Sequence, residues 1–330
     1  MTPKTRFIVI GCGRMGRRRI RSIMNHPEAE LVGVVDVSEQ DAQTAAAECH
    51  RPHYHDYKEV LSRDDVDCVI VSVPNKWHKS TVVDALESGK HVFCEKPLAL
   101  NPDEARAMVE AADANGVTLK TGSNLRFFPN VLKARELLDQ EAIGDPLFLR
   151  AWIGHNGWNL GDTWFAKKEI AGGGTFLDNG CHLLDIARWF MGEVKSCVGG
   201  TQTSHWSVQP LEDNGFGIFE TVDGRNIFVQ ASWTEWKGYM YMEIYGSRGY
   251  IRVDSRGSAC TTVLGNRKGE EEIFDYSSLP ATSFQAEFDG YMRALRTRSL
   301  PMPSGRDGLR AVEMVWAVYQ SARTGRRVEI

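Results

Sequence analysis

No stretch of this sequence is apolar for long enough to cross a membrane or to act as a secretion signal. The first apolar run, FIVI at residues 7–10, ends at a glycine, whereas a membrane-spanning helix needs about 20 apolar residues. We therefore expect a cytoplasmic protein without a membrane partner.

Cysteine is also sparse, and its pattern is not that of a disulfide framework. The seven cysteines are odd in number and scattered, at positions 12, 49, 68, 94, 181, 197 and 260. Small secreted domains instead carry an even number of cysteines at framework spacings. We expect a reducing compartment and no disulfide bond.

A charge excess of one sign is missing as well. The sequence has 39 Lys and Arg against 43 Asp and Glu, a formal net charge of -4, so no strong field attracts nucleic acid or an anionic surface. The basic cluster Arg17, Arg18, Arg19 and Arg21 does not change this, because consecutive residues spread around a helix instead of forming one stripe. We interpret the cluster as a solvated helical face and expect no nucleic-acid partner.

The chain does contain enough apolar material for two cores, with 330 residues of which 42% are hydrophobic. In the first third, short runs rich in Val and Ile alternate with amphipathic stretches. The runs lie at 7–10, 31–36, 68–73, 91–94 and 117–120, and the helical patterns at 15–25, 39–48, 78–88 and 102–115. Such alternation indicates right-handed βαβ units around a parallel sheet buried on both faces. We predict an α/β protein whose residues 1–123 form a doubly wound Rossmann domain.

After residue 123 the pattern changes. Strand-like runs are separated by Gly, Asp and Asn turns, and two helical stretches follow at 283–297 and 306–323. These features indicate a largely antiparallel, open sheet. We predict a second, α+β domain over residues 124–330 that serves substrate binding and oligomerisation.

A glycine motif, GCGRMG at residues 11–16, directly follows the first predicted strand and opens a helix. Gly11, Gly13 and Gly16 permit the tight turn, the close approach of backbone to a pyrophosphate and close helix packing. Asp36 ends the second strand twenty residues after Gly16, where an acid can bind the ribose hydroxyls and repel a 2'-phosphate. Residues 37–39 offer no compensating cation, so we predict NAD rather than NADP.

Two further motifs carry groups suited to acid–base chemistry. CEKPLAL places Lys96 just beyond an apolar strand, at the edge where ligands bind in open α/β sheets. GGGTFLDNGCH, residues 172–182, places Asp178 and His182 four residues apart, on one face of a helix, so that the carboxylate can orient an imidazole. The glycines before them would let backbone approach a bound substrate.

These motifs, together with VPNKWH at 73–78 and GKHVFCEKP at 89–97, occur in an order and spacing that resemble the Gfo/Idh/MocA oxidoreductases. This is the family of glucose-fructose oxidoreductase and inositol dehydrogenase, and the resemblance continues to residue 326. It implies that Lys96, Asp178 and His182 are catalytic. His182 would take the proton of a substrate hydroxyl as hydride leaves for nicotinamide, and Lys96 would polarise the oxygen or relay its proton.

The resemblance also implies which residues contact the ligands. The cofactor-binding residues would be Gly11, Cys12, Gly13, Arg14, Met15, Gly16, Asp36, Ser72, Val73, Pro74, Asn75, His78, Glu95, Lys96, Asn124 and Arg126. The substrate-binding residues would be Lys96, Arg126, His155, Asn156, Trp158, Trp164, Asp178 and His182. The aromatic and polar loop at 154–165 suits a polyhydroxylated ring, although its tryptophans could instead pack against the sheet.

One segment contains residues of the kinds that bind metals: Cys49, His50, His53 and His55. No second ligand pair stands nearby at zinc-site spacing, and the segment joins a helix to a strand. We predict no metal site.

We therefore expect an NAD-dependent dehydrogenase that reversibly oxidises a secondary hydroxyl of a sugar, cyclitol or sugar derivative. It would act as a homodimer or homotetramer assembled through the sheet of the second domain. Two alternatives remain: a redox-neutral glycoside hydrolase that retains NAD, and a non-catalytic, nucleotide-sensing binding protein.

Overall fold

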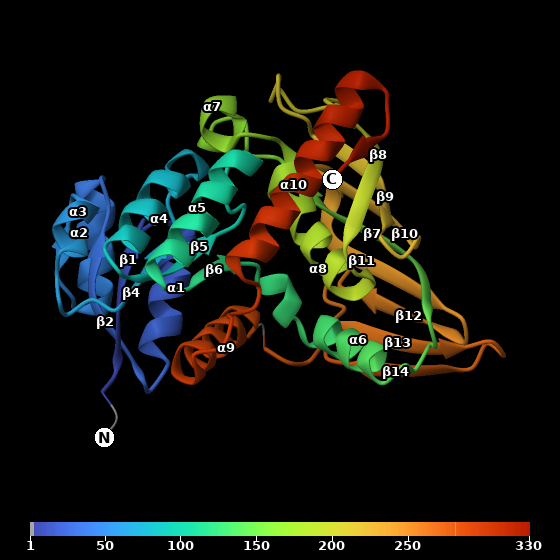
Figure 1. Ribbon diagram of the computed structural model, residues 1–330, viewed down its shortest axis with the longest axis horizontal. Coiled ribbons are helices and arrows are strands. Elements are labelled where there is room, and N and C mark those ends of the chain that lie inside the picture. The colour runs from blue at the N-terminus through green and yellow to red at the C-terminus, as the bar shows by residue number, and fades with distance from the viewer. Residues whose placement is uncertain (1–2, 281) are drawn as a thin grey trace. The chain divides into compact units, whose positions relative to one another are not determined.

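The computed structural model describes residues 3–280 and 282–330 (Figure 1). Contacts divide the chain into two compact units. The first unit takes in the chain through Ser123 together with Phe284–Leu309, and the second takes in Asn124–Ser283 together with Arg310–Ile330. Each unit is built on its own β-sheet.

The sheet of the first unit has six strands in the order β3-β2-β1-β4-β5-β6, and every neighbouring pair is parallel. Its strands are β1 (Thr5–Ile10), β2 (Ala29–Val35), β3 (His53–Tyr54), β4 (Cys68–Val71), β5 (His91–Glu95) and β6 (Leu119–Gly122). The predicted α/β class with a doubly wound parallel sheet is confirmed. The two-residue β3 is not among the predicted strands, because it is too short for a hydrophobic pattern.

Apart from the short α3, which was not predicted, the helices of this unit follow the predicted stretches closely. They are α1 (Arg14–Met24), α2 (Glu39–Cys49), α3 (Tyr57–Leu61), α4 (His78–Glu87), α5 (Pro102–Asn115) and α9 (Ser283–Thr297). At the start of α5 the Asn101 side chain accepts the backbone N–H of Glu104 at 2.9 Å, and Gly116 ends the helix with φ 62°. This is the usual asymmetry of a polar cap and a left-handed glycine.

Residues 284–309 belong to the first unit, whereas the predicted boundary at residue 123 would place them in the second domain. Phe288 and Tyr291 of α9 lie fully buried in the core of the first unit. The ring centroid of Phe288 is 5.3 Å from that of Phe7, and the ring centroid of Tyr291 is 5.5 Å from that of Phe93. Periodicity identified α9 as a helix, but it carries no information about which sheet the helix covers.

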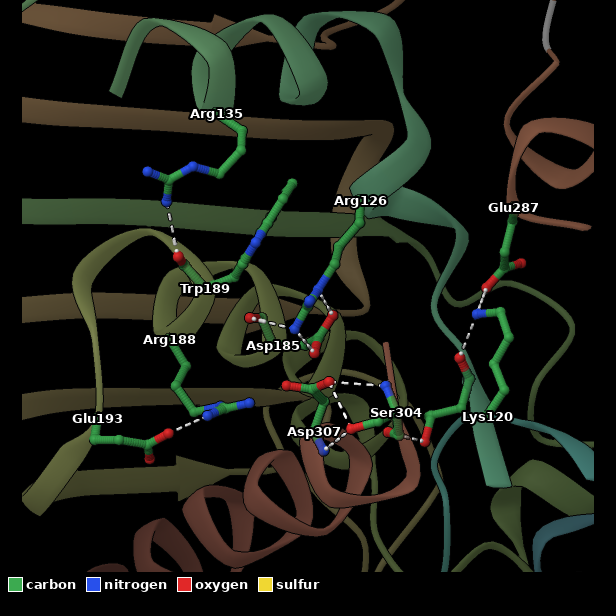
Figure 2. A network of polar contacts seen from close by, with 11 residues as sticks. Lys120, Arg126, Arg135, Asp185, Arg188, Trp189, Glu193, Glu287, Ser304 and Asp307 are labelled. Atoms are coloured by element: carbon green, nitrogen blue, oxygen red, sulfur yellow. Dashed lines mark hydrogen bonds and ion pairs between the residues drawn. The ribbon is translucent and has the colours of Figure 1, made fainter. Parts of the chain in front are cut away.

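A buried ion network ties α9 to the first sheet. Arg19 donates to Glu95 at 2.5 Å and to Glu287 at 2.7 Å, and Lys120 donates to Glu287 at 3.0 Å (Figure 2 shows the Lys120–Glu287 contact). Arg19, Lys120 and Glu287 are fully buried. The interpretation of the arginine cluster as a solvated face is therefore wrong for Arg19, whose charge is matched by acids distant in sequence.

The second sheet has nine strands in the order β14-β13-β12-β11-β7-β10-β9-β8-β15, in which β7 and β10 are parallel and the other pairs antiparallel. The predicted, largely antiparallel sheet is confirmed. Its strands are β7 (Pro146–Asn156), β8 (Val194–Gln202), β9 (Asn214–Thr221), β10 (Asn226–Ser232), β11 (Thr234–Gly246), β12 (Gly249–Asp254), β13 (Thr261–Asn266), β14 (Glu271–Asp275) and β15 (Val328–Glu329).

One face of this sheet is covered by helices. Besides η1 (Asn75–Trp77), which belongs to the first unit, the remaining helices and turns of the chain are η2 (Asn124–Phe127), α6 (Pro129–Asp139), η3 (Trp164–Ala166), α7 (Lys168–Ala171), η4 (Phe176–Gly180), α8 (Cys181–Met191) and α10 (Gly305–Thr324). Val131 of α6, Leu184 of α8 and Val315 of α10 lie in one apolar core with inward-facing strand residues such as Ile227.

The outer face of the sheet carries exposed apolar side chains. Val198, Ile218 and Phe228 lie in one register row, and they are 46%, 43% and 42% exposed. Phe216, two residues from Ile218 on the same strand, is 52% exposed. We call these four residues the apolar outer face. In the described part of the chain, no helix combines the length and apolar character needed to span a bilayer.

Candidate functional site

The glycine turn between β1 and α1 has the geometry of a phosphate-binding loop. Gly11 adopts φ +94°, and a Cβ on Gly16 would overlap the carbonyl oxygen of Gly11. These two glycines therefore let the turn close on itself and on the start of α1. Gly13 differs, because a Cβ there would meet nothing within 4 Å, so its backbone lies open to a ligand.

Asp36 lies directly after β2, and the backbone fixes both of its carboxylate oxygens. Oδ2 accepts the N–H of Cys12 at 2.7 Å, and Oδ1 accepts the N–H of Ser38 at 2.9 Å. Each oxygen retains a further lone pair that can accept a ribose hydroxyl. The following residue, Val37, is 91% exposed and brings no positive charge. This arrangement fits the adenosine ribose of NAD.

The loop after β4 contains the predicted residues Ser72, Val73, Pro74 and Asn75. Among the described residues, the buried Ser72 hydroxyl has no hydrogen-bond partner. A buried hydroxyl normally finds a partner. The unsatisfied Ser72 Oγ, the open Gly13 and the Asp36 carboxylate are all consistent with the first unit holding a dinucleotide.

Both ring nitrogens of His78, a predicted cofactor contact, lie near backbone carbonyl oxygens, and its contact with a cofactor stays a prediction. Its Nδ1 lies 2.9 Å from the carbonyl oxygen of Pro97, and its Nε2 lies 2.9 Å from that of Val73. Burial lowers the pKa of His78, although the two backbone carbonyl oxygens act in the opposite direction. His78 thus joins the loop after β4 to the loop that carries Lys96.

Glu95 and Lys96 stand at the carboxyl end of β5. Glu95 is the last residue of that strand, and its carboxylate faces the Arg19 guanidinium instead of open space. Lys96 follows it and is half-buried. The ion pair fixes the backbone from which Lys96 extends, so Glu95 has a structural role that the sequence did not reveal.

Asn124 and Arg126 of η2 belong to the second unit. Arg126 is 3% exposed, and its Nε and Nη2 donate to the two Asp185 carboxylate oxygens at 2.7 and 2.5 Å (Figure 2). The side-chain amide of Asn124 donates to the Ser283 hydroxyl at 3.0 Å. Contact of either side chain with a cofactor or substrate stays a prediction.

Two of the three glycines of the GGGTFLDNGCH motif lie close against the protein's own residues. Gly172 takes φ +83° at the end of α7. A Cβ on Gly173 would overlap the Tyr319 hydroxyl, and one on Gly174 would overlap the carbonyl oxygen of Glu212. Packing therefore requires glycine at Gly173 and Gly174, and the approach of a substrate to this backbone stays a prediction.

Glu212 holds this glycine loop in place. Its carboxylate accepts the N–H of Gly174 at 3.0 Å, the N–H of Phe176 at 2.9 Å and the Tyr319 hydroxyl at 2.7 Å. Burial raises the pKa of Glu212. The loop that leads to Asp178 is thus anchored by an acid that the sequence analysis did not single out.

Asp178 and His182 lie on consecutive helical segments. Asp178 is half-buried in η4, a π-helical turn, and His182 lies in the first turn of α8 with 8% exposure. The wider π turn, often found at functional sites, replaces the regular α-helix that the four-residue spacing predicted. The Asp178 Oδ2 atom accepts the Trp233 indole N–H at 3.3 Å and lies 4.0 Å from His155 Nε2.

The predicted substrate loop is only partly exposed. Trp158 is 72% exposed, and Asn156 Oδ1 accepts its backbone N–H at 3.0 Å. Trp164 stacks on Phe165 at 3.9 Å between ring centroids and packs against a small apolar cluster that contains Trp233. Trp158 is therefore free to contact a ligand, whereas Trp164 packs against protein.

The sequence analysis missed three residues of this region: Trp233, Glu212 and Asp185. Asp185 carried a usable signal, because an acid within the apolar run of α8 needs a buried partner. Trp233 and Glu212 carried none, since their partners lie 55 and 38 residues away.

The candidate metal ligands Cys49, His50, His53 and His55 do not come together as one cluster. His53 and His55 both face Glu39, and the Cys49 thiol is buried against the carbonyl oxygen of Ala46. In the described ranges no group of three or more His, Cys, Asp or Glu side chains is arranged to hold a metal ion. All seven cysteines are free thiols.

Comparison with known proteins agrees with this architecture. A family model described as an oxidoreductase family with an NAD-binding Rossmann fold matches residues 5–123, and one described as a GFO/IDH/MocA C-terminal domain matches residues 131–252. An inositol 2-dehydrogenase of Burkholderia multivorans is 29% identical over 326 residues, covering 96% of this chain and 94% of the relative.

Two further similarities differ in what they show. A 2,7-anhydro-N-acetylneuraminate hydratase of Escherichia coli is 30% identical over 267 residues, covering 78% of this chain and 70% of the relative. The solved structure of levoglucosan dehydrogenase with NADH and L-sorbose matches with a TM-score of 0.90 and 22% identity, covering 100% of this chain and 99% of that one. The latter similarity shows the fold alone.

Proposed function

Because the chain belongs to the Gfo/Idh/MocA oxidoreductase family and carries its NAD-binding Rossmann fold, we propose that it oxidises a secondary hydroxyl of a sugar, cyclitol or sugar derivative. This proposal rests on two sequence motifs, CEKP at 94–97 and GGGTFLDNGCH at 172–182, which supply Lys96, Asp178 and His182 as candidate acid–base groups. Loss of any of them would instead favour a non-catalytic binding protein. The similarity to an inositol 2-dehydrogenase supports a polyhydroxylated substrate.

The chain's own residues divide the work of the reaction. NAD, held by the turn at residues 11–16 and by Asp36, would supply the hydride acceptor for the carbon that bears the hydroxyl. His182 accepts the hydroxyl proton, and the Asp178 carboxylate stabilises the resulting imidazolium. Lys96 places an ammonium at the substrate oxygen and favours the carbonyl that forms there. In the reverse direction the imidazolium returns the proton to that oxygen.

Preference for NAD over NADP is assigned to Asp36. Its carboxylate is held by the N–H groups of Cys12 and Ser38, so it cannot turn away to admit a 2'-phosphate without losing both hydrogen bonds. Such charge-assisted bonds are among the stronger ones in proteins.

The test of the catalytic assignment uses Lys96→Ala and His182→Ala. Each should lower kcat/KM for an identified polyol by about 10²- to 10⁴-fold, the usual contribution of a positioned acid or base. Lys58→Ala, which removes an exposed lysine from α3, serves as the matched control and should keep wild-type activity. Turnover within a few fold of wild type in both catalytic variants would contradict the assignment.

A second candidate function is a redox-neutral reaction in which NAD is reduced and reoxidised within one cycle. The similarity to a protein named as a hydratase favours considering it, because a hydratase performs no net oxidation. Product formation without NADH accumulation, from glycosides or anhydrosugars, would identify this chemistry. Stoichiometric NADH would identify the dehydrogenase.

We further propose a homodimer or homotetramer in which the apolar outer face is covered by a second copy of the chain. Val198, Ile218 and Phe228 form an apolar row on an open sheet, and such patches usually mark an interface. The free thiols suit the cytoplasm, where the proposed substrates and NAD are available.

A further inference from the structure

We propose that Trp233 is a positioning residue for Asp178, whose indole N–H keeps the carboxylate charged and oriented for proton transfer. The inference rests on the proposed function, because it takes Asp178 as part of the reacting set. Its geometric basis is the 3.3 Å contact between Trp233 Nε1 and Asp178 Oδ2, two residues of the second unit.

Trp233 is held rigidly enough to act in this way. It is fully buried, its backbone N–H donates to the carbonyl oxygen of Asp213 at 2.8 Å, and its own carbonyl oxygen accepts the Gly157 N–H at 2.8 Å. The Trp206 indole donates to the same carbonyl at 2.7 Å. Backbone anchored on both sides, combined with a packed ring, fixes the direction of the indole N–H.

The chemistry of the contact favours one protonation state of the acid. An indole N–H can only donate, and a donor directed at a carboxyl oxygen stabilises the carboxylate over the neutral acid. A buried indole also needs an acceptor, so the two groups satisfy each other.

The other groups described near Asp178 differ from this donor. His155 Nε2 lies 4.0 Å away on a side chain that is 40% exposed, and it adds positive charge only when protonated. The Cys181 thiol donates to the Asp178 backbone carbonyl, while Glu212 acts on the backbone of the preceding loop. His182 follows in α8 as the proton acceptor. Trp233 alone among these groups offers a donor that is unchanged across the working pH range.

The direct test observes the indole N–H itself in the full-length protein labelled with ¹⁵N-tryptophan. The Trp233 resonance, identified by its loss in Trp233→Phe, should move upfield in Asp178→Asn, because a charged acceptor has become neutral. Asp223→Asn, a change at an exposed turn, is the control and should leave it in place. If the chemical shift of the Trp233 indole N–H is the same in Asp178→Asn as in the wild type, the proposal is overturned.

The kinetic test asks whether the contact matters for the reaction. Trp233→Phe should lower kcat about tenfold and move the acidic limb of the pH profile of kcat upward by about one pH unit, the size expected for a lost hydrogen bond to a charged group. KM for NAD should not change. Trp236→Phe, at a side chain of β11 that is 63% exposed, is the control and should leave the acidic limb at its wild-type position.

The outcomes separate this inference from the proposed function. If Asp178→Asn retains full turnover while the indole resonance moves, the contact exists but the catalytic assignment of Asp178 is wrong. If Asp178→Asn abolishes turnover while the resonance stays in place, or if Trp233→Phe leaves the acidic limb unmoved, only the role of Trp233 is refuted.

Discussion

Replacing Glu287 with Gln should destabilise the first unit by about 3–5 kcal/mol, the usual cost of breaking a buried ion pair by removing one partner. Glu287 is fully buried and contacts Arg19 at 2.7 Å and Lys120 at 3.0 Å. The variant keeps the shape of the side chain but leaves two buried cations opposite the single carboxylate of Glu95.

The magnitude follows from two opposing contributions. With an effective dielectric of about 20, each contact of this length corresponds to roughly 6 kcal/mol of Coulomb attraction. Desolvation of four buried groups offsets much of that sum, so the measured loss should fall well below it.

The effect should also depend on pH. Burial by itself would raise the pKa of Glu287, but Arg19 and Lys120 outweigh it and hold the pKa below its ordinary value of 4.5. Because the folded-state pKa is lowered, the stabilisation is present above pH 4.5 and is lost as pH falls through the folded value. The difference between wild type and Glu287→Gln should therefore shrink in acid.

Hydrogen exchange followed by mass spectrometry is the suitable assay, with peptides from α1 and α9 as reporters of the first unit. Tryptophan fluorescence is less suitable, because Trp77 is the one tryptophan of that unit. The control is Glu28→Gln, which breaks the exposed Glu28–Arg296 pair, with side chains 47% and 64% exposed, and should cost less than about 1 kcal/mol. Equal protection in the two variants would refute the reasoning.

Three further changes test other parts of the molecule. Asp36→Ala combined with Val37→Arg should raise the NADP-to-NAD ratio of kcat/KM at least about tenfold, and an unchanged ratio would show that Asp36 does not select the cofactor. Gly174→Ala should destabilise the second unit by about 2 kcal/mol or more, because its Cβ would overlap the Glu212 carbonyl oxygen. Gly161→Ala, where a Cβ meets nothing within 4 Å, should not, and tryptophan fluorescence during thermal unfolding compares the two. Phe228→Glu, on the apolar outer face, should convert the oligomer to monomer in gel filtration, whereas a wild-type elution volume would place the interface elsewhere.

The sequence predicted the first sheet well because its signals are local. Val- and Ile-rich runs mark strands buried on both faces, and Asn101 and Gly116 mark the ends of α5 within a residue. The glycine turn and Asp36 are likewise local features that a nucleotide-binding strand–turn–helix unit requires. Strand β3 escaped prediction for the same reason, since two residues carry no periodicity.

Features set by distant partners could not be predicted in this way. Arg19 looks like one of several surface arginines, yet it is buried because Glu287, 268 residues further along the chain, folds back onto it. Gly173 and Gly174 lie before Asp178 in a glycine run, and the sequence did not reveal that a Cβ on them would overlap Tyr319 and Glu212. In both cases the partner is distant in sequence, so no local pattern identifies it.

The amino-acid sequence by itself determined the nucleotide-binding turn, the order of strands and helices, and the identity of the candidate catalytic groups, because each depends on residue types at short spacing. Tertiary structure alone decided that α9 packs on the first sheet, that Glu212 anchors the glycine loop and that Trp233 faces Asp178. These outcomes depend on burial, because a buried charged or polar group without a partner is costly, and the fold decides which partner lies within reach.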